Sequence, residues 1–357
     1  MFDKLSEKLD SFLEMGVPFY DCIVLKDGAC VYRRAGGFTD AARTVGVTGK
    51  EKYNIYSCSK LITCTAALTL WEKGAFSLED RLSDYLPEFA HMTVKTKNGV
   101  VPAQNPILVK HLFEMTAGFS YNIHTPAIAR CREETNGRCP TRELVRCLAK
   151  DPLLFEPGER WQYSLSHDVL AALVEVLSGT SFGEYVKKSI FAPLGMCHST
   201  FLLDDSRSDE VINQYAYSAS GGVYERKRHN DYKFGSEYES GGAGCVSTVE
   251  DYVKLLEALR LGDVILKKET VDLLATDRLT EAQKKQYWMT GYGYGLGQRC
   301  PQDETKTDFG WGGASGAYYA IDRKNALSVY LGAHIVGYDA FQTAGPEILP
   351  IIQEILA

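Results

Sequence analysis

Strand signals lie at both ends of this 357-residue chain, and this distribution restricts the folds open to it. Near the N-terminus, two apolar-rich runs at 22–25 and 29–33 are joined by Lys26-Asp27-Gly28, which is hairpin turn chemistry. Strand patterns recur in the C-terminal third, at 291–297, 318–321 and 327–333. We therefore predict an α/β (α+β) protein whose antiparallel sheet draws on both ends of the sequence and is flanked by helices.

The middle of the chain indicates helices separated by loops. Helical signals occur at 106–114, 141–149 and 166–177, and strand signals are scarce. Residues 204–240 are polar, charged and rich in tyrosine, which is typical of a long surface excursion. We expect a discontinuous sheet domain, 1–77 and 241–357, with a mostly helical domain, 78–240, inserted into it. A cleft between two such domains is where we expect a substrate.

Composition excludes several classes of protein. The chain is 45% hydrophobic and 24% charged, as globular proteins are, and its formal net charge is -7. Basic residues form neither long runs nor a stripe, so we expect no nucleic-acid partner. The first fifteen residues form an amphipathic pattern rather than a secretory signal, and no apolar run approaches the roughly 18 residues that span a bilayer. We therefore expect a cytoplasmic protein with no membrane partner.

Ten cysteines and seven histidines raise the question of disulfides and metals. No cysteine pair has C-x-x-C spacing and the histidines are isolated, so the ligand pattern of a zinc site is missing. In a large chain without a secretory signal, reduced thiols are the better interpretation. The glycines of 291–297 also miss the G-x-G-x-x-G spacing of a dinucleotide loop. We expect no metal and no other cofactor.

Ser57 and Lys60 form a S-x-x-K pair directly before residues 61–71, which are apolar almost all round and predict a buried helix. Ser57 would sit at the N-terminus of this helix, with Lys60 one turn further on the same face. A serine hydroxyl becomes nucleophilic when a neighbouring base removes its proton, and a helix N-terminus favours the developing anion. The alternative is that Ser57 caps the helix and Lys60 lies on the surface.

A Pro-Gly turn at 157–158 delivers Tyr163 to a loop ahead of the next predicted helix. A tyrosine beside a cation such as Lys60 can shuttle protons. The alternative is a packed aromatic residue, since the chain has 21 tyrosines. His167 and Asp168 follow in the first turn of that helix, where an aspartate suits the helix dipole, and we interpret both as structural.

The third segment is Trp311-Gly312-Gly313-Ala314-Ser315-Gly316, which leads into the predicted strand near 318. Small residues at this point let a substrate lie along a strand edge, where a backbone N–H can bind an oxyanion. A plain glycine-rich turn is the alternative.

In this order, and with their flanks, the three segments resemble the serine β-lactamase and penicillin-binding-protein superfamily, most closely its family VIII carboxylesterases. The flanks that carry the resemblance are 105–112 (NPILVKHL), 115–118 (MTAG), 193–196 (PLGM), 241–251 (GGAGCVSTVED) and 291–297 (GYGYGLG). The resemblance implies a β-lactamase/transpeptidase-like fold, with Ser57 as the acylated nucleophile, Lys60 as its partner and Tyr163 as the general base. It also implies that Trp311, Gly312 and Gly313 replace the usual K-T-G motif, and that the N–H groups of Ser57 and Ala314 form the oxyanion hole.

Two departures from the family pattern bear on the substrate. Leu165 stands where lactamases and transpeptidases have a polar residue of the Y-x-N motif, and Trp311 stands where they have a cation or imidazole. Both changes favour uncharged esters. The expected reaction is hydrolysis of small carboxylic esters through a Ser57 acyl-enzyme. The alternatives are acyl transfer to an alcohol or amine, and β-lactamase or D-amino-acid peptidase activity. Lys60 and Tyr163 both remain candidates for the proton acceptor, because closely coupled groups titrate together.

Overall fold

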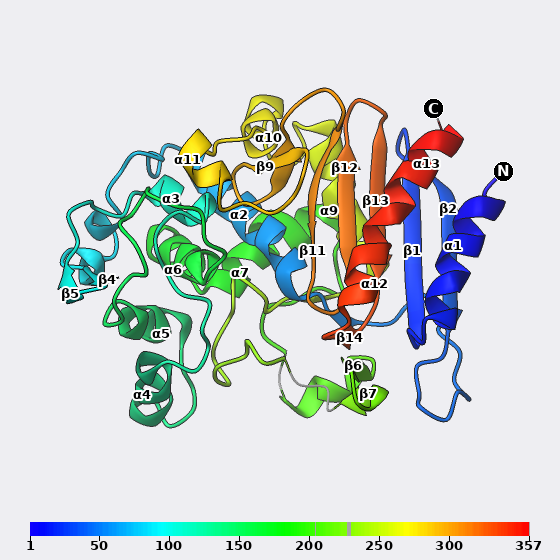
Figure 1. The fold of residues 1–357 in the computed structure, drawn as a ribbon, viewed down its shortest axis with the longest axis horizontal. Helices are drawn as coiled ribbons and strands as arrows, with labels where there is room; N and C mark the ends of the chain where they lie inside the picture. The colour runs from blue at the N-terminus through cyan, green and yellow to red at the C-terminus, as the bar shows by residue number, and fades with distance from the viewer. Residues whose placement is uncertain (204, 227–229, 357) are drawn as a thin grey trace.

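The computed structural model describes residues 1–203, 205–226 and 230–356. Its largest element is a seven-stranded antiparallel sheet (Figure 1), in the order β2-β1-β13-β12-β11-β10-β9. The strands are β1 (Phe19–Lys26), β2 (Ala29–Gly37), β9 (Tyr292–Tyr294), β10 (Arg299–Pro301), β11 (Asp308–Gly312), β12 (Tyr318–Asp322) and β13 (Leu327–Gly332). β1 pairs with β13, so that Asp21 lies opposite Gly332 and Lys26 opposite Leu327. The prediction of a sheet built from both ends of the sequence is confirmed.

Helices cover both faces of this sheet. On one face, α1 (Asp3–Glu14) lies beside α13 (Ile348–Leu356), the two chain ends being close together (Figure 1). Leu5, Leu9 and Phe12 form the buried side of α1, as their helical spacing predicts. On the other face, α9 (Val249–Leu261) packs against β13, β1 and β12. The predicted α/β class, an antiparallel sheet flanked by helices, is therefore the observed one.

Helix α2 (Ser59–Trp71) is the central helix of the molecule. All its residues from Ser59 to Leu70 are buried, which accounts for a sequence that is apolar almost all round. It packs against α6 (Ser166–Ser178), and a short 3₁₀ turn, η1 (Tyr56–Cys58), leads into it. One continuous hydrophobic core runs through both the sheet and this helical region.

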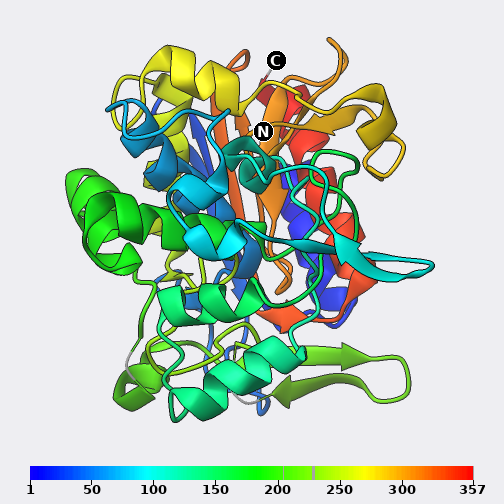
Figure 2. The same cartoon turned by 90° about the vertical axis from the view of Figure 1, so that its left-hand side faces the viewer.

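The middle region is mostly helical, as predicted, but the predicted helix at 106–114 is shorter than expected. Its elements are α3 (Val109–Phe113), α4 (Pro126–Glu134), α5 (Thr141–Leu148), α6, α7 (Phe182–Val186), a π turn at Lys187–Phe191 and α8 (Ala192–Leu194). A hairpin of β4 (Thr93–Thr96) and β5 (Gly99–Pro102), which the sequence did not predict, projects from this region (Figure 2). Its residues are mostly exposed, so they lack the apolar alternation by which strands are recognised.

The predicted surface excursion at 204–240 contains regular structure as well. Strands β6 (Gln214–Ser218) and β7 (Gly222–Arg226) form a hairpin, and β6 also pairs in parallel with β14 (Ile335–Val336) (Figures 1 and 2). The sequence did not predict these two strands, because their segment is polar and β6 pairs with the distant β14. Residue 204 and residues 227–229 of the excursion lie outside the described residues.

The shorter elements complete the chain: β3 (Tyr53–Asn54), β8 (Val246–Ser247), α10 (Lys268–Leu274), α11 (Glu281–Lys284), α12 (Asp339–Ala344), and the 3₁₀ turns Leu82–Asp84, Pro87–Phe89, Asp205–Glu210 and Gly345–Glu347. All ten cysteines are free thiols, eight of them buried. Within the described ranges, no single helix has both the length and the apolar character needed to cross a membrane.

Candidate active site

The S-x-x-K pair lies at the N-terminal end of α2, as its position in the sequence predicts. Ser57 belongs to η1 and is 8% exposed, whereas Lys60, in the first turn of α2, is fully buried. The Lys60 Nζ donates hydrogen bonds to the Ser57 Oγ (3.2 Å) and to the Gly242 carbonyl (2.7 Å). The alternatives of a helix-capping serine and a surface lysine are both wrong, because Ser57 caps no helix and Lys60 has no solvent contact.

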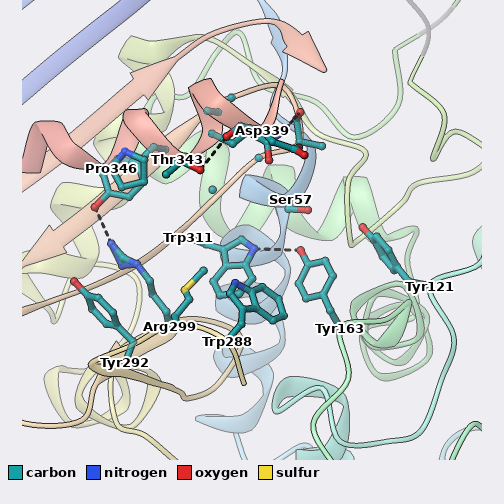
Figure 3. Close-up of a pocket in the computed structure, with 18 of the residues that line it drawn as sticks. Ser57, Tyr121, Tyr163, Trp288, Tyr292, Arg299, Trp311, Asp339, Thr343 and Pro346 are labelled. Carbon is teal, nitrogen blue, oxygen red and sulfur yellow. Dashed lines mark hydrogen bonds between the residues drawn. The ribbon is translucent and has the colours of Figure 1, made fainter. Parts of the chain in front are cut away.

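Tyr163 reaches the same place from the loop ahead of α6. Its ring lies under the Lys60 ammonium, with Nζ 4.6 Å from the ring centroid, a cation–π contact. Its hydroxyl accepts a hydrogen bond from the Trp311 Nε1 (3.2 Å), and the two rings stack (Figure 3). The structure thus brings together Ser57, Lys60, Tyr163 and Trp311, which come from three distant stretches of the sequence.

The Trp-Gly-Gly segment at the end of β11 lies close to the turn that carries Ser57. A Cβ added to Gly313 would lie 2.5 Å from the Ile55 carbonyl oxygen, so only glycine allows this approach. Gly313 also donates its N–H to the Ala317 carbonyl (2.8 Å), which fixes the turn that carries Ala314. Ser57, Trp311, Gly312, Gly313 and Ala314 all line one pocket.

This pocket has a volume of about 910 Å³ and is lined mainly by aromatic and small residues. Of its five tyrosines the sequence analysis identified only Tyr163, and two of the others, Tyr121 and Tyr232, lie beside it. The Tyr121 ring packs edge-on against Tyr163, with Lys60 Nζ 5.5 Å from its centroid, and Tyr232 packs against Tyr121. Burial raises the pKa of both, well above the ordinary value for Tyr121. Tyr121 follows the family-like segment 115–118 by three residues, and that proximity is the one signal that could have found it.

At its far end the pocket holds a buried ion pair. Arg299 on β10, which lines the pocket (Figure 3), pairs with Asp308 on β11 (2.6 Å), and the Tyr318 hydroxyl accepts a second hydrogen bond from it (2.8 Å). Both charged side chains are nearly fully buried. Because Asp308 neutralises this arginine, the pocket gains a polar group without gaining a net positive charge.

Leu165 lies elsewhere. It is 3% exposed, packs in a small separate core with Ile128 and Leu144, and is not among the residues that line the pocket. Residue 165 therefore makes no contact with the pocket. The leucine contributes packing rather than substrate contact.

Rim residues shape the opening of the pocket. Trp288, in the segment between α11 and β9, is 59% exposed and packs on Trp161, with ring centroids 4.9 Å apart, and on Trp311 at 6.2 Å. An exposed indole beside an apolar pocket favours a ligand that covers it. Among the described residues, no group of three or more His, Cys, Asp or Glu side chains could hold a metal ion.

Comparisons with known proteins agree with this geometry. Lovastatin esterase from Penicillium rubens is 30% identical over 314 residues, covering 76% of this chain and 76% of its own. Acyltransferase calJ from Penicillium decumbens is 28% identical over 305 residues, covering 76% and 72%. Among solved structures, "EstCE1, a hydrolase with promiscuous acyltransferase activity" superposes with a TM-score of 0.80 at 22% identity, covering 96% of this chain and 98% of that one.

The family comparison covers almost the whole chain. The family model described as Beta-lactamase matches residues 17–347, which include every segment of the site. This confirms the superfamily that the three motifs and their flanks indicated. The chain belongs to the beta-lactamase family.

Proposed function

We propose that this protein is a serine hydrolase that cleaves small, uncharged carboxylic esters through an acyl-enzyme on Ser57. The observation that carries the proposal is the contact of the buried Lys60 Nζ with the Ser57 Oγ at 3.2 Å, under the ring of Tyr163. A buried amine at hydrogen-bond distance is the activation that a serine nucleophile needs.

The proposed reaction has two halves. In the first, the Lys60–Tyr163 pair takes the Ser57 proton, Oγ bonds to the ester carbonyl carbon, and the bond to the alcohol oxygen breaks as the alcohol leaves with that proton. In the second, water attacks the acyl carbon, the acid leaves and Ser57 regains its proton. The backbone N–H groups of Ser57 and Ala314 are the proposed donors to the oxyanion. The Trp311 N–H, which donates to the Tyr163 hydroxyl, can also donate to the tyrosinate oxygen, and it would then stabilise the charge that forms on Tyr163.

The pocket supports an uncharged substrate. Its lining is largely aromatic, and its arginine, Arg299, is already paired with Asp308. Trp311 occupies the place where related lactamases present a cation, so a substrate carboxylate would find no unpaired positive group among the described lining residues. The esterase among the relatives supports the same choice.

Intact-mass spectrometry during turnover of p-nitrophenyl butyrate tests the proposal. The parent should show a transient butyryl adduct, and Ser57→Ala should show none and lose roughly 10³-fold or more in hydrolysis rate. Ser247→Ala is a matched control, since Ser247 is equally buried but bonds to Ser199 and does not line the pocket. An undiminished rate in Ser57→Ala would overturn the assignment.

Two further additions to the same assay separate the alternatives. If added butanol gives butyl butyrate faster than water gives the acid, the protein is an acyltransferase, the activity in the name of one relative. Fast hydrolysis of a cephalosporin or of a D-alanyl-D-alanine peptide would instead indicate lactamase or peptidase activity.

A further inference from the structure

Lys60 is a buried cation that lacks an acidic partner at salt-bridge distance. Its Nζ bonds to the Ser57 Oγ and the Gly242 carbonyl and faces the rings of Tyr121 and Tyr163. Within the described part of the chain, no ion pair joins it to a carboxylate. A charge removed from water in this way is costly unless a counter-charge stands near it.

Asp168, in the first turn of α6, is a buried carboxylate, and one of its two oxygens has no hydrogen-bond partner among the described residues. It is 1% exposed, and its Oδ1 accepts hydrogen bonds from the Tyr238 hydroxyl and the Ser240 Oγ, both at 2.6 Å. Its Oδ2 is buried and has no hydrogen-bond partner among the described residues. Buried carboxylate oxygens are normally satisfied, so this one requires an explanation.

The Asp168 carboxylate and the Lys60 ammonium both lie close to Gly242. A Cβ added there would lie 2.5 Å from the Asp168 Oδ2 and 3.5 Å from the Lys60 Nζ, so the charged atoms are no further apart than the sum of these distances. Opposite charges at such a separation in a buried site interact strongly. Gly242 donates its N–H towards Asp168 (3.4 Å) while its carbonyl accepts from Lys60 (2.7 Å).

The loop that carries Gly242 is held from both sides. On the α2 side, the Thr63 hydroxyl donates to the Gly241 carbonyl (2.7 Å) and the Cys245 N–H donates to the Ser59 Oγ (3.0 Å). On the α6 side, Asp168 is the anchor. The Gly242 carbonyl that accepts the hydrogen bond of Lys60 is thus fixed relative to both helices.

The other titratable groups around the pair are thiols, phenols and one imidazole. Those that face Lys60 or Asp168 are Cys58, Cys64, Tyr121, Tyr163, His167, Tyr232 and Tyr238. Burial and then the Lys60 charge lower the pKa of His167 to about 3. Burial raises the pKa of Cys58 and Cys64, and burial together with the Asp168 charge raises that of Tyr121 and Tyr238. Asp168 is left as the negative charge in the cluster.

We propose that Asp168 is a positioning residue for Lys60: its carboxylate is the buried counter-charge of the ammonium, and its hydrogen bonds fix the Gly242 carbonyl that directs Nζ toward Ser57. The inference rests on the proposed function and goes beyond it. Helix α6 then contributes to the reaction through a residue that touches no substrate. The position of Asp168 in the first turn, which suits the helix dipole, is only part of its role.

The sign of the expected effect follows from charge alone. The active form of the Lys60–Tyr163 pair has one proton fewer, and one positive charge fewer, than the inactive form. Asp168→Asn removes a negative charge, so the pair gives up its proton more easily. The acid limb of the pH profile of kcat/KM should move to lower pH by roughly one unit. Tyr238→Phe removes a hydrogen bond from the carboxylate while keeping its charge, and should move the limb to higher pH.

The experiment measures Ser57 labelling by a fluorophosphonate and hydrolysis of p-nitrophenyl butyrate between pH 5 and 9. Asp251→Asn is the matched control, because Asp251 is also a buried third residue of its helix, α9, with bonds to Ser199 and Lys254 and no contact with the pocket. Its profile should coincide with that of the parent. A merely structural role for Asp168 would lower the rates without moving the limb.

The outcomes separate this inference from the proposed function. If the parent reacts with neither probe, the proposed function fails and the inference fails with it. If the parent reacts and Asp168→Asn keeps the parental limb, the inference alone is wrong. Should Asp168→Asn not fold, Tyr238→Phe decides by itself, since an unmoved limb there overturns the proposal and a limb at higher pH supports it.

Discussion

The Trp311 indole donates its N–H to the Tyr163 hydroxyl across 3.2 Å while the two rings stack with centroids 5.6 Å apart. A tryptophan at this place therefore does more than replace a cation by apolar surface. It orients the tyrosine on one side, while Lys60 lies over the tyrosine ring at 4.6 Å. The position of the Tyr163 hydroxyl thus depends on a side chain from β11, far away in the sequence.

Trp311→Phe should separate the contribution of the hydrogen bond to Tyr163 from that of ring stacking. It keeps an aromatic ring for stacking and removes the N–H donor, so kcat/KM for p-nitrophenyl butyrate should fall by about tenfold, the usual value of one hydrogen bond. Trp161→Phe is the matched control, since Trp161 also packs near Tyr163 but its buried Nε1 has no partner in the described structure. Equal losses in the two variants would contradict the role assigned to the hydrogen bond.

Gly313→Ala should reduce activity through the backbone. The new Cβ would come within 2.5 Å of the Ile55 carbonyl and push the end of β11 away from the turn that carries Ser57. Because small misplacements at a reacting centre are costly, we expect kcat to fall at least about tenfold. Gly46→Ala is the control, since a Cβ there meets nothing within 4 Å. A fully active Gly313→Ala variant would show that this approach is not needed.

Trp288→Ala should change substrate preference rather than stability. The side chain is 59% exposed, so its loss removes little core packing, but it removes apolar surface at the rim of the pocket. Esters with a naphthyl or long alkyl group should lose about tenfold in kcat/KM, and acetates should change little. Trp288→Phe should retain most of the preference. The ratio of the two kcat/KM values is the measurement, and an unchanged ratio would exclude contact with substrate.

Acid should destabilise the fold through a buried histidine. Burial, with the Lys110 ammonium nearby, lowers the pKa of His111 to about 4, and its Nδ1 accepts the Leu108 N–H (3.2 Å). An unfolded histidine takes up a proton below about pH 6.5, whereas this one stays neutral down to about pH 4. The contribution of the neutral His111 to the free energy of unfolding is therefore fully present above pH 6.5, and it is lost as the pH falls from 6.5 to about 4.

His111→Gln makes that effect measurable. Between pH 7 and pH 5 the parent should lose about 2 kcal/mol more of its free energy of unfolding than the variant, because every other titrating group is shared and cancels. Urea denaturation at the two pH values gives this difference directly. Identical losses in the two proteins would mean that His111 is not kept neutral by the fold.

The fold was predictable where the signals are local. The hairpin at the N-terminus and the strands near the C-terminus were readable because apolar runs alternate with turn residues, and α2 because no polar face interrupts it. The hairpin of β6 and β7 was not predicted, since its segment is polar and one of its strands, β6, also pairs with β14, more than a hundred residues away. The sequence around β6 gives no sign that β14 will pair with it.

In the site, too, residues with a local sequence signal could be predicted, and residues that depend on distant contacts could not. Ser57 and Lys60 could be proposed because they lie three positions apart at the start of a buried helix, and Tyr163 because of its flanks. Tyr121, Arg299 and Asp168 could not, since each joins the cluster through contacts between distant segments. For Leu165, the position was identified but its surroundings were not, because nothing in the sequence separates a cleft residue from a core residue beside it.

Helix α2 is surrounded on every side by other parts of the protein; its first turn carries Lys60, and the 3₁₀ turn that leads into it carries Ser57. Substitutions along it will disturb packing and chemistry together, so this helix leaves little freedom for change. Part of the pocket wall comes instead from the separate segments around Trp288 and Thr343, which do not belong to α2. New substrate preferences, whether evolved or engineered, are therefore to be sought in these two segments.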